Sequence, residues 1–275
     1  MIIRAVTTIE ECRQVAALEM NVWEYSDKED VVPPPVLIVS VKRGGILLGG
    51  FNEGGALKGF VYSIPAIKNG QLTQWSHMLG VTRDVRNSGL GLRLKLAQRD
   101  RAREMGIELM EWTFDPLQVV NASLNFTRLG VVVEEYEENI YGDSSSPLHR
   151  GSPTDRFVAE WHVNAPHVER RIAAAGLIAR DQSVAAAPVT NPSTAGTPLR
   201  PGTPDLSITD RRLLVEIPAG FTDIQAADPV LALEWRLSTR AVFQHYFAHG
   251  YRAVDFFPAP NAGRGHYLLA LRSAD

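Results

Sequence analysis

Residues 77–114 read "HMLGVTRDVRNSGLGLRLKLAQRDRAREMGIELMEWTF", and this stretch decides the fold. An apolar run leads into the loop "RNSGLG" at residues 86–91, and a long segment of mixed basic and apolar residues follows. Gly89 and Gly91 have no Cβ, so their backbone can adopt positive φ and approach a ligand closely. We expect a helix over residues 92–105 directly after them. The first N–H groups of such a helix lack internal partners, which makes its N-terminus an anion site.

Three kinds of phosphate loop compete for this pattern. A P-loop needs Lys followed by Ser or Thr, and Leu92 and Arg93 stand there instead, so we exclude it. A dinucleotide fingerprint needs a third glycine, where Leu94 stands, and an acidic residue about 20 positions on, for which Asp115 is roughly placed. This match is partial, and the fingerprint belongs to a parallel βαβ unit. The third kind, a coenzyme A loop, depends on the flanking segments.

The upstream sequence predicts a short strand, a helix and then a meander. Residues 1–6 are apolar, and a helix is expected from Thr8 to about Trp23, with Glu10 and Glu11 in its first turn. The stretch "SDKEDVVPPP" is expected to be a loop, because its prolines lack backbone donors. Four β-rich runs bounded by Gly, Asn or Pro then predict an antiparallel meander; they are residues 36–44, 45–55, 56–70 and 71–81.

The downstream sequence predicts alternating strands and helices. We expect strands over 107–114, 131–142 and 156–163, with a helix over 118–130 that ends at Gly130. Residues 173–207 are rich in Ala, Pro, Gly, Thr and Ser without a clear period, which is typical of a linker or extended surface segment.

The last part of the chain predicts a strand, a helix and two strands. The helix spans Asp228–Ala248, and its expected apolar face carries Val230, Leu233, Leu237, Val242 and Phe247. The segments "NFTRLGVVVEEY" and "HYFAHGYRAVDFF" both place an aromatic residue four positions before a glycine and a strand. Either this echo is a coincidence or the tail copies half of the first domain.

Composition favours a small-molecule partner. Apolar residues make up 45% of the 275, charged residues 21%, and the formal net charge is −3, so no bulk positive field attracts nucleic acid or anionic lipid. Cys12 is the one cysteine, which excludes an intramolecular disulfide, fits a cytoplasmic location and is typical of a buried structural thiol. The N-terminus does not resemble a signal peptide, and no apolar run approaches the ~18 residues of a membrane span.

Residues 77–131 as a whole resemble the GCN5-related N-acetyltransferase (GNAT) superfamily. Its coenzyme A loop is Arg/Gln-x-x-Gly-x-Gly/Ala between a strand and a long helix, as Arg86, Gly89 and Gly91 are arranged. The family's next strand and helix carry an Asn and end in Leu-Gly, as Asn121, Leu129 and Gly130 do. "SHMLGV", "WTFDP", "NIYG" and "PTDRFVAEW" further resemble a bacterial subgroup of acyltransferases with a C-terminal extension, in which N-succinylation of amino acids is one candidate activity.

The resemblance implies a fold and a domain order. It implies an α/β (α+β) fold, in which helices flank a mixed, mostly antiparallel sheet, over residues 1–165. A linker or extended segment at 166–210 and a small C-terminal α/β domain at 211–275, a candidate half-GNAT-like unit, would follow. Acetyl-CoA or another acyl-CoA is the implied co-substrate, no metal is expected, and a homodimer is kept as an option.

The resemblance also implies where coenzyme A binds. The loop backbone would hold the pyrophosphate, and Arg86 or Arg93 would pair with a phosphate. The pantetheine arm would lie along the strand before the loop, in a gap between two strands. Asn121 either hydrogen-bonds this arm or caps a helix. The implied coenzyme-binding residues are Leu79, Gly80, Val81, Arg86, Asn87, Ser88, Gly89, Leu90, Gly91 and Asn121.

Direct attack of an amine on the thioester needs proton transfer. His77 is the candidate base, because it precedes the coenzyme strand and titrates near neutral pH; Glu111 is the second candidate. Many family members protonate the leaving thiolate with a tyrosine at the position of Phe126, so Tyr141, or else Tyr136, is the substitute considered.

The acceptor is the least specified part of the site. Arg156 could clamp the carboxylate of an amino-acid acceptor, or form a surface salt bridge with Asp155; Arg150 lies in the same loop. The sequence thus predicts an N-acyltransferase acting on a small-molecule amine. A non-catalytic acyl-CoA-binding protein and a nicotinamide-dependent enzyme are the rivals.

Overall fold

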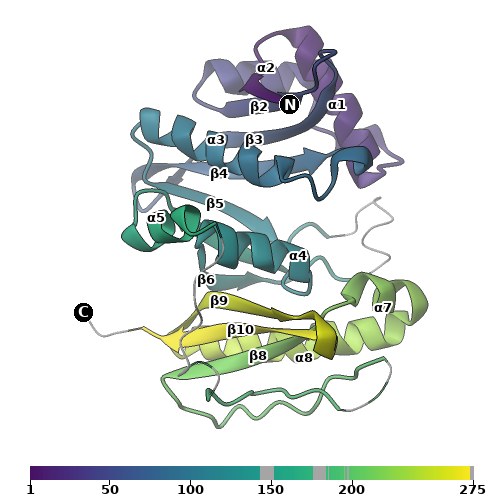
Figure 1. The fold of residues 1–275 in the computed structure, drawn as a ribbon, viewed down its shortest axis with the longest axis vertical. Coiled ribbons are helices and arrows are strands. Elements are labelled where there is room, and N and C mark those ends of the chain that lie inside the picture. Colours follow the sequence, from purple (N-terminus) through teal and green to yellow (C-terminus); the bar gives the residue numbers. More distant parts are fainter. Residues whose placement is uncertain (143–151, 176–183, 185, 195, 197, 273–275) are drawn as a thin grey trace. The chain divides into compact units, whose positions relative to one another are not determined.

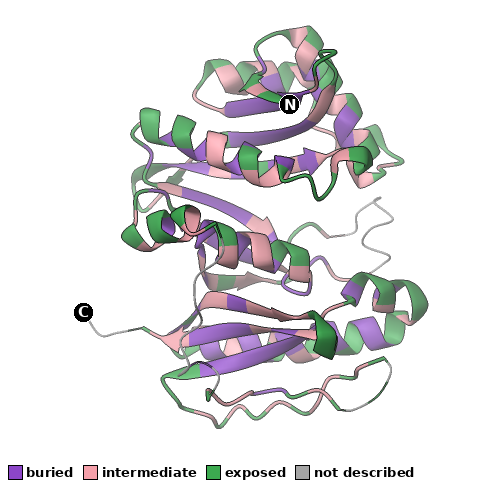
Figure 2. Ribbon diagram, viewed as in Figure 1, coloured by how far each residue is buried: buried purple, intermediate pink, exposed green. Residues whose placement is uncertain are grey.

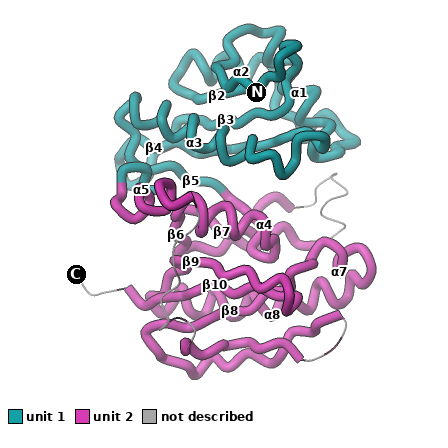
Figure 3. The backbone as a smooth tube through the Cα atoms, viewed as in Figure 1, with its two compact units in different colours: residues 1–112, 144–149, 162–164 teal, residues 113–143, 150–161, 165–275 magenta. Residues whose placement is uncertain are grey.

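The computed structural model describes residues 1–142, 152–175, 184, 186–194, 196 and 198–272. The chain forms two compact units, coloured separately in Figure 3. Of the described residues, unit 1 comprises 1–112 and 162–164, and unit 2 comprises 113–142, 152–161 and those from 165 onward. Among the residues described, no helix combines the length and the apolar content needed to cross a bilayer.

Unit 1 is a sheet with helices on both faces (Figure 1). Its strand order is β1-β2-β3-β4-β5, antiparallel except for the parallel pair β4–β5. On β3, Gly59 lies against Leu90 of α3, whereas the next residue, Phe60, packs against Trp23 of α1. Because neighbouring strand residues point to opposite faces, α1 and α3 cover opposite faces of the sheet. The elements are β1 (Ile2–Ala5), α1 (Ile9–Trp23), α2 (Pro34–Lys42), β2 (Ile46–Phe51), β3 (Leu57–Lys68), β4 (Gln71–Val81), α3 (Leu90–Glu104) and β5 (Leu109–Phe114), with short 3-10 turns at Lys28–Asp30 and Arg83–Val85.

Two helix starts in unit 1 have clear local causes. Thr8 and Glu11 form a reciprocal capping box, which confirms the predicted start of α1. The prediction of a strand over residues 36–44 is wrong, because residues 36–42 belong to α2. Pro34 and Pro35 lie at the first helical positions, where a missing N–H costs nothing, so the prolines open this helix and do not only break structure. Cys12 is fully buried, as expected of a structural thiol.

Unit 2 is built on an antiparallel sheet with the strand order β7-β6-β9-β10-β8. Its helices include α4, which continues as a π-helix over Ser123–Leu129 and ends at Gly130, as predicted. The elements are α4 (Val119–Ala122), β6 (Val132–Glu137), β7 (Arg156–His162), α5 (Pro166–Ala173), β8 (Arg212–Pro218), α7 (Phe221–Ala227), α8 (Pro229–Ala248), β9 (Tyr251–Ala259) and β10 (Arg264–Leu271).

The two segments that echo each other in sequence lie side by side in this sheet. Gly130 and Gly250 both adopt left-handed φ, 72° and 83°, and each is followed by two strands. The strands directly after them, β6 and β9, pair antiparallel at Val133 and Ala253, each three residues past its glycine. Antiparallel pairing at equivalent positions is what a local twofold axis produces. The helix–glycine–strand–strand order is therefore repeated about such an axis within unit 2.

The buried face of α8 differs from the predicted one. Val230, Leu233 and Leu237 are 69%, 40% and 47% exposed, so the predicted apolar face is wrong except for the buried Val242 and for Phe247, whose ring packs against Phe157. Aromatic side chains set the orientation instead, because they bury the most area. Phe243 packs against Phe157, Tyr136 and Tyr267. Figure 2 shows the buried stripe along α8 and the strands of its own unit.

The segment predicted as a linker, 166–210, contains ordered structure where it is described. It includes α5, and it also covers the outer edge of β8. Val189 forms a parallel bridge with Leu214. The Asn191 side chain then donates to Glu216 O (2.9 Å) and accepts from Glu216 N (2.8 Å), which satisfies both backbone groups of an edge residue.

Candidate active site

The predicted phosphate loop forms a tight turn that leads directly into α3. Asn87 and Gly89 both adopt left-handed φ, 62° and 83°. The Ser88 hydroxyl donates to Val85 O (2.7 Å), which closes the turn. The helix begins at Leu90, two residues earlier than predicted, because the turn ends at Gly89.

The N-terminus of α3 is open toward a ligand. No side chain caps it, so the N–H groups of its first turn lack intrahelical partners. A Cβ built on Gly89 meets no atom within 4 Å, which leaves room for a bound group. Arg86 is exposed in the loop, whereas Arg93 donates to Met1 O (2.9 Å). The loop therefore combines space, unpaired donors and one exposed cation, which fits a pyrophosphate.

Strands β4 and β5 part immediately before this loop. They pair only at Gln74–Met110 and Trp75–Glu111, although β4 continues to Val81. The predicted arm-binding residues Leu79, Gly80 and Val81 pair with β3 on their other edge. An unpaired strand edge can bind an extended amide-containing chain through its backbone groups. Gly80 is also required for packing, since a Cβ there would lie 3.1 Å from the Trp23 ring.

His77 is the extra residue of a β-bulge in β4. Tyr62 pairs with Met78 and Ser63 with Ser76, so His77 has no counterpart on β3. Bulges redirect a side chain and recur beside active sites. His77 is exposed as a whole residue, but its ring meets Tyr62 edge-on at 6.2 Å, and partial desolvation of the ring lowers its pKa below the usual 6.5. A neutral imidazole at neutral pH can accept a proton.

Glu111 lies where the two strands part, but it is not free. It is 6% exposed and forms an ion pair with Lys68 at 2.6 Å. The Lys68 ammonium therefore already occupies this carboxylate. The geometry therefore favours His77 over Glu111 as the proton acceptor.

Three predicted residues, Asn121, Tyr141 and Arg156, belong to unit 2. Asn121 is exposed within α4, and the helix begins at Val119 with Gln118 as its N-cap, so the alternative of Asn121 as a cap is wrong. Arg150 lies outside the described residues.

Tyr141 and Arg156 form a local cluster. The Tyr141 hydroxyl is 2.6 Å from Thr113 Oγ1, and the Arg156 guanidinium lies over the Tyr141 ring at 5.5 Å. Arg156 donates to the backbone oxygen of Asp155 (2.9 Å). The Asp155 carboxylate accepts from Arg240 (2.8 Å).

The other positions considered for the proton donor carry no available acid. Phe126 is fully buried against the rings of Phe114 and Tyr267. The Tyr136 hydroxyl donates to Asp155 (2.6 Å), and burial together with that carboxylate raises the pKa of Tyr136 well above its usual range. Tyr136 therefore does not substitute for the missing tyrosine.

Sequence reasoning missed three buried charges in unit 1. Lys95, Glu19 and Arg99 are only 3%, 1% and 4% exposed. The Arg99 Nε donates to Val163 O (2.7 Å). Lys95 and Arg99 are four positions apart, and Ala102 lies near the same helix face. This spacing was the signal from which their burial could have been predicted.

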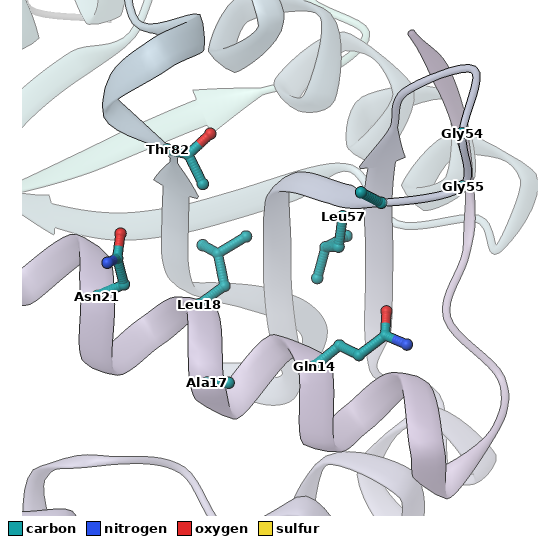
Figure 4. A pocket seen from close by; sticks show the side chains of 9 residues that line it. Gln14, Ala17, Leu18, Asn21, Gly54, Gly55, Leu57 and Thr82 are labelled. Carbon is teal, nitrogen blue, oxygen red and sulfur yellow. The ribbon is translucent and has the colours of Figure 1, made fainter.

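A separate hollow of about 640 Å³ lies between α1 and the β2–β3 turn (Figure 4). Gln14, Leu18 and Asn21 of α1 face Gly54, Gly55 and Leu57 across it, and Thr82 lies at one end. None of the predicted site residues lines it, and no charged side chain does. The hollow thus offers nothing to a pyrophosphate, and the donor site is better placed at the α3 N-terminus.

Comparison with known proteins gives distant similarity. No protein-family model and no curated protein matches the chain. Solved structures that match include a GNAT-family acetyltransferase from Streptococcus pneumoniae (15% identity, TM-score 0.47, 58% of this chain and 97% of that one). They also include aminoglycoside 6'-acetyltransferase type Ii (18%, 0.46, 60% and 99%) and the PaiA N-acetyltransferase of Thermoplasma acidophilum with coenzyme A (17%, 0.42, 58% and 98%). GNAT-family acetyltransferases thus recur among the matches, as the sequence resemblance leads one to expect. Similarity this distant does not assign an activity or an acceptor, which we argue from the geometry of the site.

Proposed function

We propose that this protein is an acyl-CoA-dependent N-acyltransferase. It would transfer an acetyl or succinyl group to the amine of a small molecule, by direct attack within a ternary complex. The observation that carries this proposal is the parting of β4 and β5 beside the uncapped N-terminus of α3. The two features provide backbone donors for an anion at one end and an unpaired strand edge along the approach to it.

The donor side of the site follows from this geometry. Backbone N–H groups from Asn87 to Gly91 would hold the pyrophosphate, with Arg86 pairing with one phosphate. The arm would run along β4 at Leu79–Val81 toward the point where the strands part. A backbone N–H near Met78 would then polarise the thioester carbonyl, next to the bulge at His77.

The acceptor side is proposed in less detail. His77 would take the proton that the attacking amine releases, because it is neutral and redirected by the bulge. In unit 2, Arg156 would bind a carboxylate of the acceptor, and Asn121 and Tyr141 remain candidates for binding the arm and for proton transfer. An amino acid is the acceptor class that uses both an amine and a carboxylate.

A second candidate function is a non-catalytic acyl-CoA-binding protein. It is favoured by Phe126, which places a buried ring where the resemblance expects an acid. Tight binding of acetyl-CoA, with no free thiol released over a panel of amino acids and polyamines, would support this alternative.

The test of the donor site is Gly89→Asp, measured by calorimetric titration with acetyl-CoA. We expect no detectable binding, because a side chain and a negative charge would enter the phosphate site. Gly70→Asp is the matched control, since Gly70 has nearly the same φ (77° against 83°), also has no atom within 4 Å of a built Cβ, and lies in the β3–β4 turn. Normal binding by Gly89→Asp would show that the assignment is wrong.

Transfer itself is tested by free-thiol release from acetyl-CoA and succinyl-CoA with the same amine panel. A nicotinamide-dependent enzyme would instead bind NADH, which a fluorescence titration detects and which we expect not to occur.

A further inference from the structure

The amine of Lys95 lies where β4 and β5 begin to part. Ser76 and Trp112 are the residues directly after the last β4–β5 pair, one on each strand. Lys95 Nζ is 2.8 Å from Ser76 Oγ and lies 3.6 Å from the centroid of the Trp112 ring. The amine therefore spans the two strands at the inner end of their unpaired edges.

In the part of the chain that the structure describes, this amine has polar partners and no opposite charge beside it. Its other partner is Gln98 Oε1 at 3.3 Å, and Ser76 Oγ donates to the same oxygen at 3.0 Å. Gln98 is fully buried, and among the described residues its Nε2 has no hydrogen-bond partner. A buried donor without a partner is costly, so this atom points to a group that the protein binds there.

We propose that Lys95 is the proton donor to the leaving thiolate of coenzyme A. This rests on the proposed function, which brings the thioester to the inner end of the β4–β5 edges. The acceptor nitrogen forms a bond to the acyl carbon, and the carbon–sulfur bond breaks with its electron pair on sulfur. The Lys95 ammonium gives its proton to that sulfur, His77 takes the proton that the acceptor nitrogen releases, and both side chains regain their starting protonation from solvent after the products leave. Lys95 thereby fills the role that Phe126 leaves vacant.

Burial adapts lysine to this role. An ordinary lysine, with a pKa of about 10.4, holds its proton more tightly than a thiolate with a pKa of about 8.5. Desolvation lowers the pKa of Lys95 well below its usual 10.5, and no neighbouring charge contributes to the shift. The Trp112 face stabilises the ammonium while it exists, and Ser76 and Gln98 fix its position.

The test reads the proton of Lys95 through the pH dependence of transfer. Free-thiol release from acetyl-CoA, with the best amine of the panel, is followed against pH. An acid that donates in the reaction is inactive once it has lost its proton, so we expect the wild-type rate to fall as pH rises through the lowered pKa of Lys95. Lys95→Met should be slower and should lack this basic limb. Lys42→Met, at an exposed lysine of the same unit, should keep the wild-type profile.

Two further measurements make the outcome decisive. Ser76→Ala keeps the lysine but removes the hydroxyl that orients it, so a smaller loss of rate is expected, and this variant serves if Lys95→Met does not fold. Identical rates and pH profiles of the wild type and these folded variants would overturn the role of Lys95. Calorimetry with coenzyme A separates the two proposals: binding together with transfer that does not depend on Lys95 refutes only this inference, whereas no binding to the wild type refutes both.

Discussion

Units 1 and 2 handle buried charge in different ways. In unit 2, Asp115 accepts two hydrogen bonds from Arg236 (2.6 and 2.9 Å), and Asp155 accepts two from Arg240 (2.8 and 2.9 Å). In unit 1, Glu19 accepts only from the Val32 backbone N–H (3.2 Å), and Lys95 meets a hydroxyl, an amide and a ring. Neither Glu19 nor Lys95 has an ion pair in the described part of the chain.

The difference separates structural charge from charge that can exchange protons. A compensated carboxylate stays ionised, and the Arg236 guanidinium holds the pKa of Asp115 below its usual range despite burial. An uncompensated group moves toward neutrality instead: burial raises the pKa of Glu19 to about 7 and lowers that of Lys95. Perturbed groups of this kind cluster at functional sites, and both belong to the unit that contains the phosphate loop.

The largest loss of stability is expected when a compensating charged partner is removed in unit 2. Arg236→Ala leaves Asp115 buried and unpaired, so we expect a loss of about 3–5 kcal/mol in the free energy of unfolding, measured by urea denaturation. Arg200→Ala is the control, because the Arg200–Glu234 pair is exposed and should contribute about 1 kcal/mol or less. Equal losses for the two variants would contradict the comparison.

In unit 1, replacing the uncompensated Glu19 should stabilise the protein, and only at higher pH. Glu19 has a raised pKa in the folded state, so its ionisation opposes folding: stability is full below about pH 4.5 and falls until about pH 7, by about 3 kcal/mol. Glu19→Gln should remove this fall. Thermal unfolding from pH 4.5 to 8 measures the difference between wild type and variant, and a constant difference would show that Glu19 does not titrate as stated.

Removing an uncharged buried side chain in unit 2 should lower stability by less than removing Arg236 does. Asn191→Ala removes two hydrogen bonds from the Glu216 backbone, and we expect a loss of about 1–3 kcal/mol. Asn261→Ala, at an exposed position, should change stability by no more than about 0.5 kcal/mol. If the two variants unfold alike, the segment around Asn191 does not stabilise β8.

The smallest effect on stability is expected at His77, where only activity should change. His77→Ala removes an exposed side chain and should leave unfolding unaffected. With the best amine of the panel, the wild-type rate should fall as pH drops through the lowered pKa of His77, because the protonated imidazole cannot accept a proton. The variant should be slower and lack this limb. An unchanged pH–rate profile would exclude His77 from proton transfer.

Local signals in the sequence were sufficient for the turn at residues 86–91, the helix after it and most strands. The glycine spacing in "RNSGLG" and the alternation after it predicted the turn, α3 and β5 with small errors at the ends. Prolines were ambiguous, since they both break and begin helices, and this hid α2. A bulge of one residue leaves no pattern in a single strand, so His77 was selected for its chemistry and not for its geometry.

Long-range pairs could not be predicted, because nothing local couples their members. Asp115 and Arg236 are separated by 121 positions, and Asp155 and Arg240 by 85. Arg156 is adjacent to Asp155 and was considered as its partner; Arg240, which donates to the carboxylate, is distant in sequence. Nothing in the sequence singled out Lys95, and because lysine is rarely buried, its burial is informative.

The pairing of β6 with β9 has a consequence for synthesis. Val133 emerges from the ribosome long before its partner Ala253, and at roughly 5–20 residues per second the interval is on the order of 10 s. During that time the outer edge of β6 has no strand to pair with, and exposed edges recruit other chains. The nascent chain therefore carries an unpaired β6 edge until its last strands are made, and truncation before β9 would leave a chain prone to aggregation.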